Sequence, residues 1–348
     1  MKNNFQSLTN FAQEIERIEQ TKNDYLVSTK EIIMTDDNYL EFEGHKGEDR
    51  LAVNEYAHGQ IADKCGIPRK YYDKMIERPA LRSLNVNAWL HQKEERNLVR
   101  TLDNKVRAVL SDRFKPIDNF GILMTSIFPV LQPIKNELEI KALSVSETKM
   151  YIQFIIKSLT AEIKVGDVVQ YGLTISNSEV GAGSLNVEDW IWRKVCSNGM
   201  VRQSLFKKYH VGKRIEEDEN YHIWKSDTLK NELAGYQLRL RDVLNNALTK
   251  GSFNEQVRKL QGATTDKVTN IVDTVQNVTK RFMLSENDGK FIIQNMTENK
   301  EASRYGIANG ITALAHDIEN PDRQYQMEKL GSQIIDLSPS DWRIVNAA

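Results

Sequence analysis

Residues 168–200 read VVQYGLTISNSEVGAGSLNVEDWIWRKVCSNGM, and this stretch decides the fold class. Its first nine residues alternate between two sets of side chains, as a half-buried β-strand requires. Val169, Tyr171, Leu173 and Ile175 form the apolar set. A loop follows, rich in residues that tolerate positive φ or hydrogen-bond their own backbone. The residues of this motif loop are Asn177, Ser178, Glu179, Gly181 and Gly183. We therefore predict two long strands joined by a loop.

The rest of the chain extends this strand pair into an α+β fold with a mainly antiparallel sheet. Further strands within 97–196 are joined by short connections such as 103–105, and short connections favour hairpin pairing. From about residue 227 the pattern becomes helical, because apolar side chains recur at helical spacing at Leu229, Leu233, Tyr236, Leu240 and Leu244. We expect an α+β body over 1–220 and a C-terminal helical region over 226–348.

A helical hairpin is expected as an insertion in this body, over 54–78. Residues 58–77, HGQIADKCGIPRKYYDKMIE, fit the spacing of a helix-turn-helix with Gly66 at the turn. The second helix would point Arg69, Lys70 and Lys74 outward. In a DNA-reading motif these cations would lie at phosphates and base edges, whereas any tight helical hairpin shows the same packing pattern. Both interpretations stay open.

The charge balance excludes a global attraction to nucleic acid, because the formal net charge is −1 over 348 residues. Local asymmetry is pronounced, however. Residues 193–214 contain no acid and seven cations, which are Arg193, Lys194, Arg202, Lys207, Lys208, Lys213 and Arg214. Trp190 and Trp192 precede this run, and Phe206 and Tyr209 lie inside it. Cations for phosphates and flat rings for base stacking suit a sequence-tolerant nucleic-acid surface. The alternative is that the tryptophans lie in the core and the cations line a solvated edge.

A second basic segment spans residues 96–115, RNLVRTLDNKVRAVLSDRFK. On the predicted hairpin, side chains two apart share a face, so one face is partly cationic. Arg107, Arg113 and Lys115 are the candidates for phosphate contacts. An ordinary exposed face explains the same pattern, and this alternative also stays open.

Catalysis finds little support in the sequence. The two cysteines, Cys65 and Cys196, argue against a disulfide scaffold and are too few for a thiolate-rich zinc site. No histidine stands in a recognisable relation to Cys196, the six histidines form no metal-ligand pair, and no phosphate-cradling Gly-Lys-Ser/Thr motif is present. We expect no catalytic residue, no cofactor and no metal.

The chain contains no window near the apolar length of a membrane span, and its N-terminus lacks the apolar region of a signal peptide. We therefore expect a cytoplasmic protein without a membrane partner. The apolar stripe after residue 227 exceeds what one sheet face needs, which favours a homo-oligomer built through these helices.

Four segments together resemble the phage/plasmid-like protein family, a prokaryotic family of unknown function found on phages, prophages and plasmids. They are LVRTLDNKVRAVLSDRFKPIDN at 98–119, VGDVVQYGLTISNSEVGAGSL at 165–185, RKVCSNGMV at 193–201 and NGITALAHDIENPDRQYQMEKLGSQII at 309–335. The resemblance covers most of the chain from about residue 50, and NSEVG at 177–181 is a fairly specific motif within it. It implies a mobile-element context and brings no established activity.

These observations lead to one expected function and two alternatives. We expect a non-enzymatic nucleic-acid-binding protein of a phage or plasmid that binds DNA, favours single strands and serves annealing in recombination or replication. The first alternative is an interaction protein that binds a host defence or replication protein without contacting nucleic acid. The second is a metal-dependent nuclease.

Overall fold

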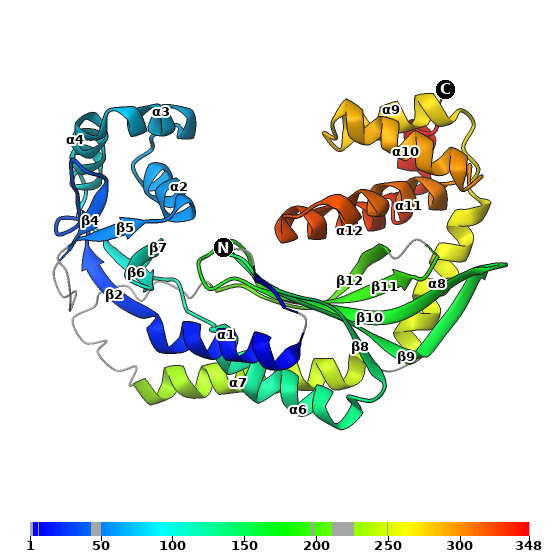
Figure 1. Ribbon diagram of the computed structural model, residues 1–348, viewed down its shortest axis with the longest axis horizontal. Helices are drawn as coiled ribbons and strands as arrows, with labels where there is room; N and C mark the ends of the chain where they lie inside the picture. Colours follow the sequence, from blue (N-terminus) through cyan, green and yellow to red (C-terminus); the bar gives the residue numbers. More distant parts are fainter. Residues whose placement is uncertain are drawn as a thin grey trace.

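The computed structural model describes residues 3–5, 7–42, 50–195, 198–210, 226–248 and 250–347. It shows an α+β fold with two six-stranded sheets and a C-terminal helical region, which confirms the predicted class. In Figure 1 the smaller N-terminal sheet and the C-terminal helices rise as two arms from the central sheet. We call the two sheets the N-terminal sheet and the central sheet.

The N-terminal sheet has the order β2-β6-β7-β5-β4-β3. Its strands are β2 (Asn23–Ser28), β3 (Ile33–Met34), β4 (Tyr39–Glu41), β5 (Leu51–Val53), β6 (Arg96–Leu102) and β7 (Lys105–Ser111). The pairing of β5 with β7 is parallel, and the other pairings that the structure describes here are antiparallel. The β6–β7 turn has Asp103 and Asn104 at φ of 50° and 57°, as a two-residue hairpin turn requires. The predicted hairpin is therefore confirmed.

Three helices are inserted between β5 and β6, and they are α2 (Glu55–Lys64), α3 (Arg69–Lys74) with the short η1 (Met75–Glu77), and α4 (Pro79–Leu90). The side chain of Asn54 caps α2, and Gly66 adopts a φ of 64° at the turn into α3. These helices and the N-terminal sheet share one hydrophobic core that includes Ile61, Tyr72 and Val99. The predicted helical hairpin is present.

The central sheet has the order β1-β8-β9-β10-β11-β12 and is antiparallel in every pairing that the described residues show. Its strands are β1 (Asn3–Asn4), β8 (Leu138–Val145), β9 (Met150–Lys164), β10 (Asp167–Asn177), β11 (Leu185–Arg193) and β12 (Asn198–Lys208). The two strands that we predicted around the motif loop are β10 and β11.

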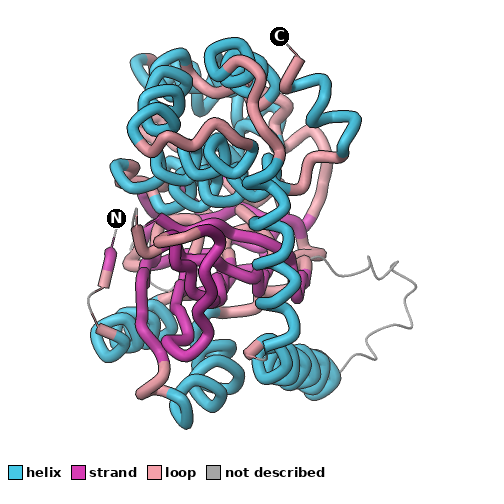
Figure 2. The backbone as a smooth tube through the Cα atoms, turned by 90° about the vertical axis from the view of Figure 1, so that its right-hand side faces the viewer, coloured by secondary structure: helices cyan, strands magenta, loops and turns pink. Residues whose placement is uncertain are grey.

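The expectation of a half-buried strand was wrong for β10, because side chains on both of its faces are buried. Figure 2 shows the strands as a layer between two layers of helices. Below the sheet in Figure 1 lie α1 (Leu8–Thr21), α6 (Phe128–Leu131) and α7 (Ser226–Ala247), and above it lie α11 (Arg304–Leu314) and α12 (Pro321–Ile335). Period-two alternation separates two faces but does not say which of them meets water.

Residues 119–134 form four short helical pieces instead of one regular helix. They are α5 (Asn119–Ile122), the π-helical η2 (Leu123–Ile127), α6 and η3 (Gln132–Ile134). Pro129 is the second residue after the π-helical turn, and a proline cannot donate the backbone hydrogen bond that a regular α-helix needs. The side chain of Ser126 in this turn donates to the carbonyl of Gln237 on α7, 2.8 Å away.

The C-terminal region is helical, as predicted. Besides α7, α11 and α12 it contains α8 (Lys250–Thr265), α9 (Ile271–Arg281), α10 (Glu286–Glu298), η4 (Ala315–Asp317) and α13 (Pro339–Val345). These helices share a hydrophobic core with the central sheet, so the cores divide the chain differently from the boundary we expected near 220. Leu240 and Leu244 are fully buried within the chain, which leaves them unavailable for the expected oligomer contact. No helix among the described residues combines the length and apolar character of a bilayer span.

Helix α12 packs on the central sheet through polar contacts. Asp322 accepts hydrogen bonds from Thr148 and Tyr151 at 2.6 Å each. Glu328 is buried and accepts hydrogen bonds from Gln153 Nε2 at 2.6 Å and Trp190 Nε1 at 3.2 Å. Burial raises the pKa of Glu328 to about 7, although both donors work in the opposite direction. The contact between α12 and the sheet therefore depends on a carboxyl group that titrates near neutral pH.

Replacing Glu328 with Gln should stabilise the protein at alkaline pH. The folded-state pKa of Glu328 lies above the ordinary value of 4.5, so its contribution to stability is complete below that value and is lost as pH rises through 7. The amide of Gln accepts the same two bonds without a charge. Relative to its effect below pH 4, we expect Glu328→Gln to gain about 3 kcal/mol near pH 8 and less than about 1 kcal/mol near pH 5 in urea unfolding. The matched change Glu298→Gln at an exposed position should show no such pH dependence, and equal gains at both pH values would contradict the assignment.

Candidate nucleic-acid interface

The motif loop is a buried joint between the two sheets. Glu179 Oε2 accepts from Arg107 Nη2 at 2.8 Å, and its Oε1 accepts from the backbone N–H of Asn119 at 2.7 Å. The carbonyl of Glu179 accepts from Arg100 Nη1 at 2.7 Å. The next carbonyl, that of Val180, accepts from Gln60 of α2 at 2.8 Å. The loop thus connects β10 and β11 to the N-terminal sheet and its helices.

The remaining motif-loop residues complete this joint. Asn177 is buried and donates to the carbonyl of Ile117 at 2.7 Å. Ser178 donates to the carbonyl of Thr148 at 2.8 Å. Gly181 lies against Leu110 of β7, and Gly183 lies against Lys149. All of these contacts are internal, which indicates a structural role for the most specific motif in the sequence.

A buried ionic network surrounds the joint. Arg100 is fully buried and pairs with Asp24 at 2.7 Å and with Asp118 at 2.8 Å. Burial lowers the pKa of Arg100, but the two carboxylates outweigh it and keep the pKa above the ordinary value. Burial opposes ionisation of Asp118, yet Arg100 and Lys22 hold its pKa below the ordinary value. Arg100 and Asp118 therefore stay charged at neutral pH.

Three arginines predicted to contact nucleic acid are buried, and this part of the prediction needs correction. Arg107 pairs with Glu179, and Arg193 pairs with Asp167 through bonds of 2.7 and 2.9 Å. Arg202 donates to Gln256 at 3.0 Å, to Ser332 Oγ at 2.7 Å and to Asp336 at 3.0 Å. All three side chains are buried, so their guanidinium groups meet carboxylates, amides and hydroxyls instead of phosphates.

The alternative interpretation, in which the tryptophans lie in the core, holds for one of the two. Trp190 is buried in the core, whereas Trp192 is half-buried with the ammonium of Lys141 over its ring at 4.5 Å.

The other predicted cations lie in separate places. Among the hairpin cations, Arg69 pairs with Asp73 at 2.7 Å and also with Glu55, and Lys70 and Lys74 are exposed on the six-residue α3. Lys194 is exposed at the end of β11 far from Lys208. Lys213, Arg214 and Cys196 lie outside the described residues.

The two basic segments of the sequence meet at the end of β12. The ring of Phe114 stacks on His210 with centroids 5.0 Å apart and planes 6° apart. The backbone N–H of Lys115 donates to the carbonyl of His210 at 2.5 Å, and His210 Nε2 lies 3.1 Å from Asn177 Oδ1. Burial lowers the pKa of His210 to about 4, so the stacked imidazole is neutral at pH 7.

Cations and aromatic rings lie around this stack. Because consecutive strand residues point to opposite faces, Lys207 lies beside Tyr209 on one side of the end of β12, and Lys208 lies beside Tyr236 of α7 on the other. We call this region the basic–aromatic surface, and it consists of Arg113, Lys115, Lys207, Lys208, Tyr209, Tyr236 and Arg239. Tyr209 is 61% exposed, and Lys207 Nζ lies 4.8 Å from the centre of its ring. Lys208 Nζ lies 3.8 Å from the ring centre of Tyr236 on α7. The surface therefore offers ammonium groups beside aromatic faces.

Two acids border this surface, Glu232 and Asp112. Lys115 Nζ lies 2.9 Å from Glu232 Oε2, and the hydroxyl of Tyr236 donates to the other oxygen at 3.1 Å. The hydrogen bond from Lys115 lowers the pKa of Glu232, so this acid is ionised at neutral pH. Among the described residues, the five cations of this surface outnumber these two acids. Our sequence analysis missed Tyr236 and Arg239 as surface residues, because helical spacing assigned Tyr236 to the apolar stripe.

No protein-family model matches the chain, and no curated protein or solved structure matches it. The assignment of a function therefore rests on the geometry and charge of the chain itself.

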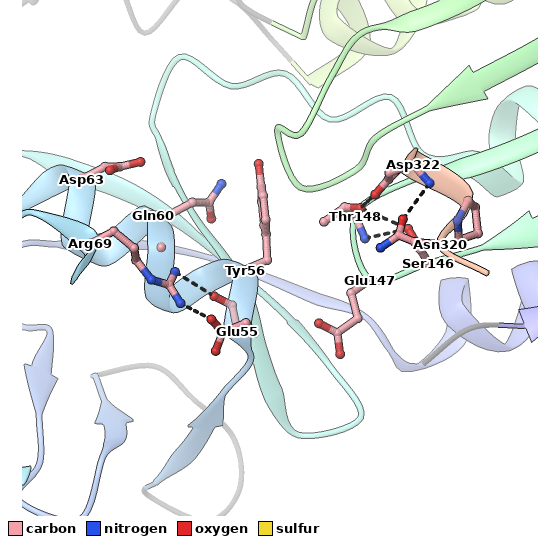
Figure 3. A pocket seen from close by; sticks show the side chains of 12 residues that line it. Glu55, Tyr56, Gln60, Asp63, Arg69, Ser146, Glu147, Thr148, Asn320 and Asp322 are labelled. Carbon is pink, nitrogen blue, oxygen red and sulfur yellow. Dashed lines mark hydrogen bonds and ion pairs between the residues drawn. The ribbon is translucent and has the colours of Figure 1, made fainter. Parts of the chain in front are cut away.

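A cavity of about 580 Å³ lies elsewhere, between α2, the β8–β9 turn and the start of α12. Figure 3 shows Glu55, Tyr56 and Gln60 on one wall and Glu147 and Asp322 on the other. Most charged residues of this lining are acids, and such a lining repels phosphates. Among the described residues, no group of three or more His, Cys, Asp or Glu side chains is placed to hold a metal ion.

Proposed function

We propose that this protein binds single-stranded DNA on the basic–aromatic surface and catalyses no reaction on it. One observation carries the proposal: two segments about ninety residues apart bring their cations to one place, beside an exposed tyrosine. Ammonium and guanidinium groups attract the phosphate backbone regardless of sequence, so they account for affinity without base reading.

The exposed ring of Tyr209 favours single strands. Bases in a duplex hide their faces in the stack, whereas an unpaired base can lie flat on an aromatic side chain. Lys207 Nζ lies 4.8 Å from the centre of this ring, so a strand that reaches Tyr209 also meets a positive charge. The surface therefore combines the two elements of sequence-tolerant single-strand binding.

The biological context remains part of this proposal. The resemblance of the motif segments to the phage/plasmid-like protein family supports a cytoplasmic role on a mobile element. Annealing of strands during recombination or replication would use a protein that binds single strands without sequence preference. The analogy concerns context and architecture only.

Removing three cations should weaken single-strand binding and reduce its salt dependence. We expect the triple change Arg113→Ala, Lys207→Ala and Lys208→Ala to lower affinity roughly 10- to 100-fold near 0.1 M salt. The slope of log affinity against log salt should become shallower by about 2. Tyr209→Ala should instead lose about 1–3 kcal/mol with an unchanged slope. Fluorescence anisotropy with single-stranded and duplex oligonucleotides at several salt concentrations measures all three quantities.

The control is Lys280→Ala with Lys290→Ala, which removes exposed cations from α9 and α10. This variant should bind like the wild type. If the wild type shows no salt-dependent binding, or if the triple variant binds as tightly as the control, the proposed function fails. A stable complex with a cellular protein, in a chain that ignores DNA, would instead support the alternative of a host-protein ligand.

A further inference from the structure

The basic–aromatic surface is assembled from three segments that lie far apart in sequence. Arg113 and Lys115 follow β7, residues 207–209 lie at the end of β12, and Tyr236 and Arg239 belong to α7. Sheet pairing does not hold the first two segments together, because among the described residues β7 pairs with β5 and β6, whereas β12 pairs with β11. The surface therefore depends on contacts made beyond the ends of these strands.

Helix α7 supplies one link between the two segments, and this link is exposed. Lys115 Nζ pairs with Glu232, and both side chains are more than one third exposed. Lys208 lies over the ring of Tyr236 on the same helix. Exposed ion pairs of this kind contribute little to stability. A second link, at His210, is buried.

His210 makes three separate contacts. Its backbone carbonyl accepts from the N–H of Lys115 at 2.5 Å, and its imidazole stacks on the ring of Phe114 with the planes 6° apart. Its Nε2 lies 3.1 Å from Oδ1 of Asn177, which ends β10 and begins the motif loop. His210 thus joins the end of β12 both to the segment after β7 and to the buried joint.

The hydrogen-bond pattern fixes the tautomer of the imidazole. Asn177 Nδ2 donates to the carbonyl of Ile117 at 2.7 Å and to Asn119 Oδ1 at 2.9 Å, so Asn177 Oδ1 is the acceptor and His210 Nε2 carries the proton. His210 Nδ1 is buried and has no partner among the described residues. An apolar side chain would avoid the cost of this unpaired acceptor, but it would lose the bond to Asn177.

We infer that His210 is a positioning residue of the basic–aromatic surface. It holds the cations at the end of β12 beside Arg113 and Lys115. The side chain itself does not meet DNA, because His210 is only 4% exposed. Cations held in fixed positions bind a strand more tightly, since binding then does not have to order them. This inference rests on the proposed function.

Amide hydrogen exchange without DNA tests the link itself. In His210→Ala we expect the amide of Lys115 to exchange at least about tenfold faster than in the wild type, because the imidazole no longer holds its acceptor in place. The amide of Val109 on β7, which donates to Gln60 Oε1 at 2.9 Å, should keep its rate and serves as the internal control. If Val109 also loses protection, His210→Phe replaces the alanine variant, because it keeps a ring on Phe114 and lacks the bond to Asn177.

Fluorescence anisotropy with a single-stranded oligonucleotide near 0.1 M salt tests the positioning role. We expect His210→Ala to lower the affinity about tenfold. In a background of Arg113→Ala with Lys115→Ala, the same change should lower it less than about twofold, because the cations beside which His210 holds β12 are then absent. A change that only destabilised the fold would cost the same factor in both backgrounds.

His58→Ala is the matched control, because His58 in α2 is another histidine whose pKa burial lowers to about 4. This variant should match the wild type in both measurements. Unchanged protection of the Lys115 amide in His210→Ala overturns the inference, and so does an equal loss of affinity in the two backgrounds. A wild type that binds no DNA contradicts the proposed function, whereas the exchange measurement still decides whether His210 holds the two segments together.

Discussion

Replacing Glu179 with Ala should reduce the free energy of unfolding by about 3–5 kcal/mol. Its carboxylate is the acceptor for the buried guanidinium of Arg107 and for the backbone N–H of Asn119. Arg107 Nε already lacks a hydrogen-bond partner, so loss of Glu179 leaves a buried cation with no opposite charge at its side chain. Urea unfolding at pH 7 measures the loss. A decrease below about 1 kcal/mol would contradict the role of the motif loop as a joint.

The double variant Arg107→Met with Glu179→Leu separates charge from packing. Replacing both partners of a buried ion pair with apolar side chains removes the unpaired charge, and such replacements are often close to neutral. We expect the double variant to recover most of the stability that Glu179→Ala loses. If it is as unstable as Glu179→Ala, the loss of unfolding free energy comes from the lost hydrogen bond to the backbone N–H of Asn119 instead of the unpaired charge.

Local rules were sufficient to predict much of the fold. The alternation in β10, the Asp103-Asn104 turn and the Gly66 turn between α2 and α3 each depend on a few neighbouring residues. Backbone sterics and the alternation of side chains along a strand depend on a few neighbouring residues. These features can therefore be predicted from a single sequence. How the buried residues divide into two hydrophobic cores cannot be predicted in this way. It depends on which helices, distant in sequence, cover each face of the two sheets.

The candidate site shows where local reasoning fails. Arg107, Arg193 and Arg202 have the composition of a basic surface, but each meets an acid that lies 26 to 134 residues away in sequence. The sequence gives no indication of these pairings. Only burial decides between a phosphate ligand and an internal ion pair. The same limitation hid Tyr236 and Arg239, which join the basic–aromatic surface only because α7 packs beside the end of β12.

The distribution of charge explains how a nearly neutral chain can present a basic surface. Many of its carboxylates neutralise buried arginines, and others line the cavity beside α2. Among the residues that the structure describes, few acids lie near the exposed cations at the end of β12. The net charge of −1 therefore says little about the local potential that a DNA strand would meet.

Replacing Gly172 with Ala should abolish the native fold or cost more than about 4 kcal/mol. Gly172 lies in the middle of β10, at an irregularity in its pairing with β9. A Cβ atom at this position would lie 1.9 Å from the carbonyl oxygen of Phe154 and 2.9 Å from the Cα of Ile155. Both atoms belong to the backbone of the neighbouring strand, so no side-chain rotation relieves the clash. The two strands would have to separate at the centre of the central sheet.

Gly235→Ala is the matched control, because the same methyl group is added where no atom lies within 4 Å. Gly235 lies inside α7, where alanine is favoured over glycine by about 1 kcal/mol. We expect this variant to melt at a slightly higher temperature than the wild type, while Gly172→Ala melts far lower or fails to accumulate in soluble form. Thermal unfolding followed by circular dichroism distinguishes them. If Gly172→Ala melted like the wild type, β9 and β10 could not approach each other as closely as this structure requires, and the buried joint that depends on the end of β10 would lose its support.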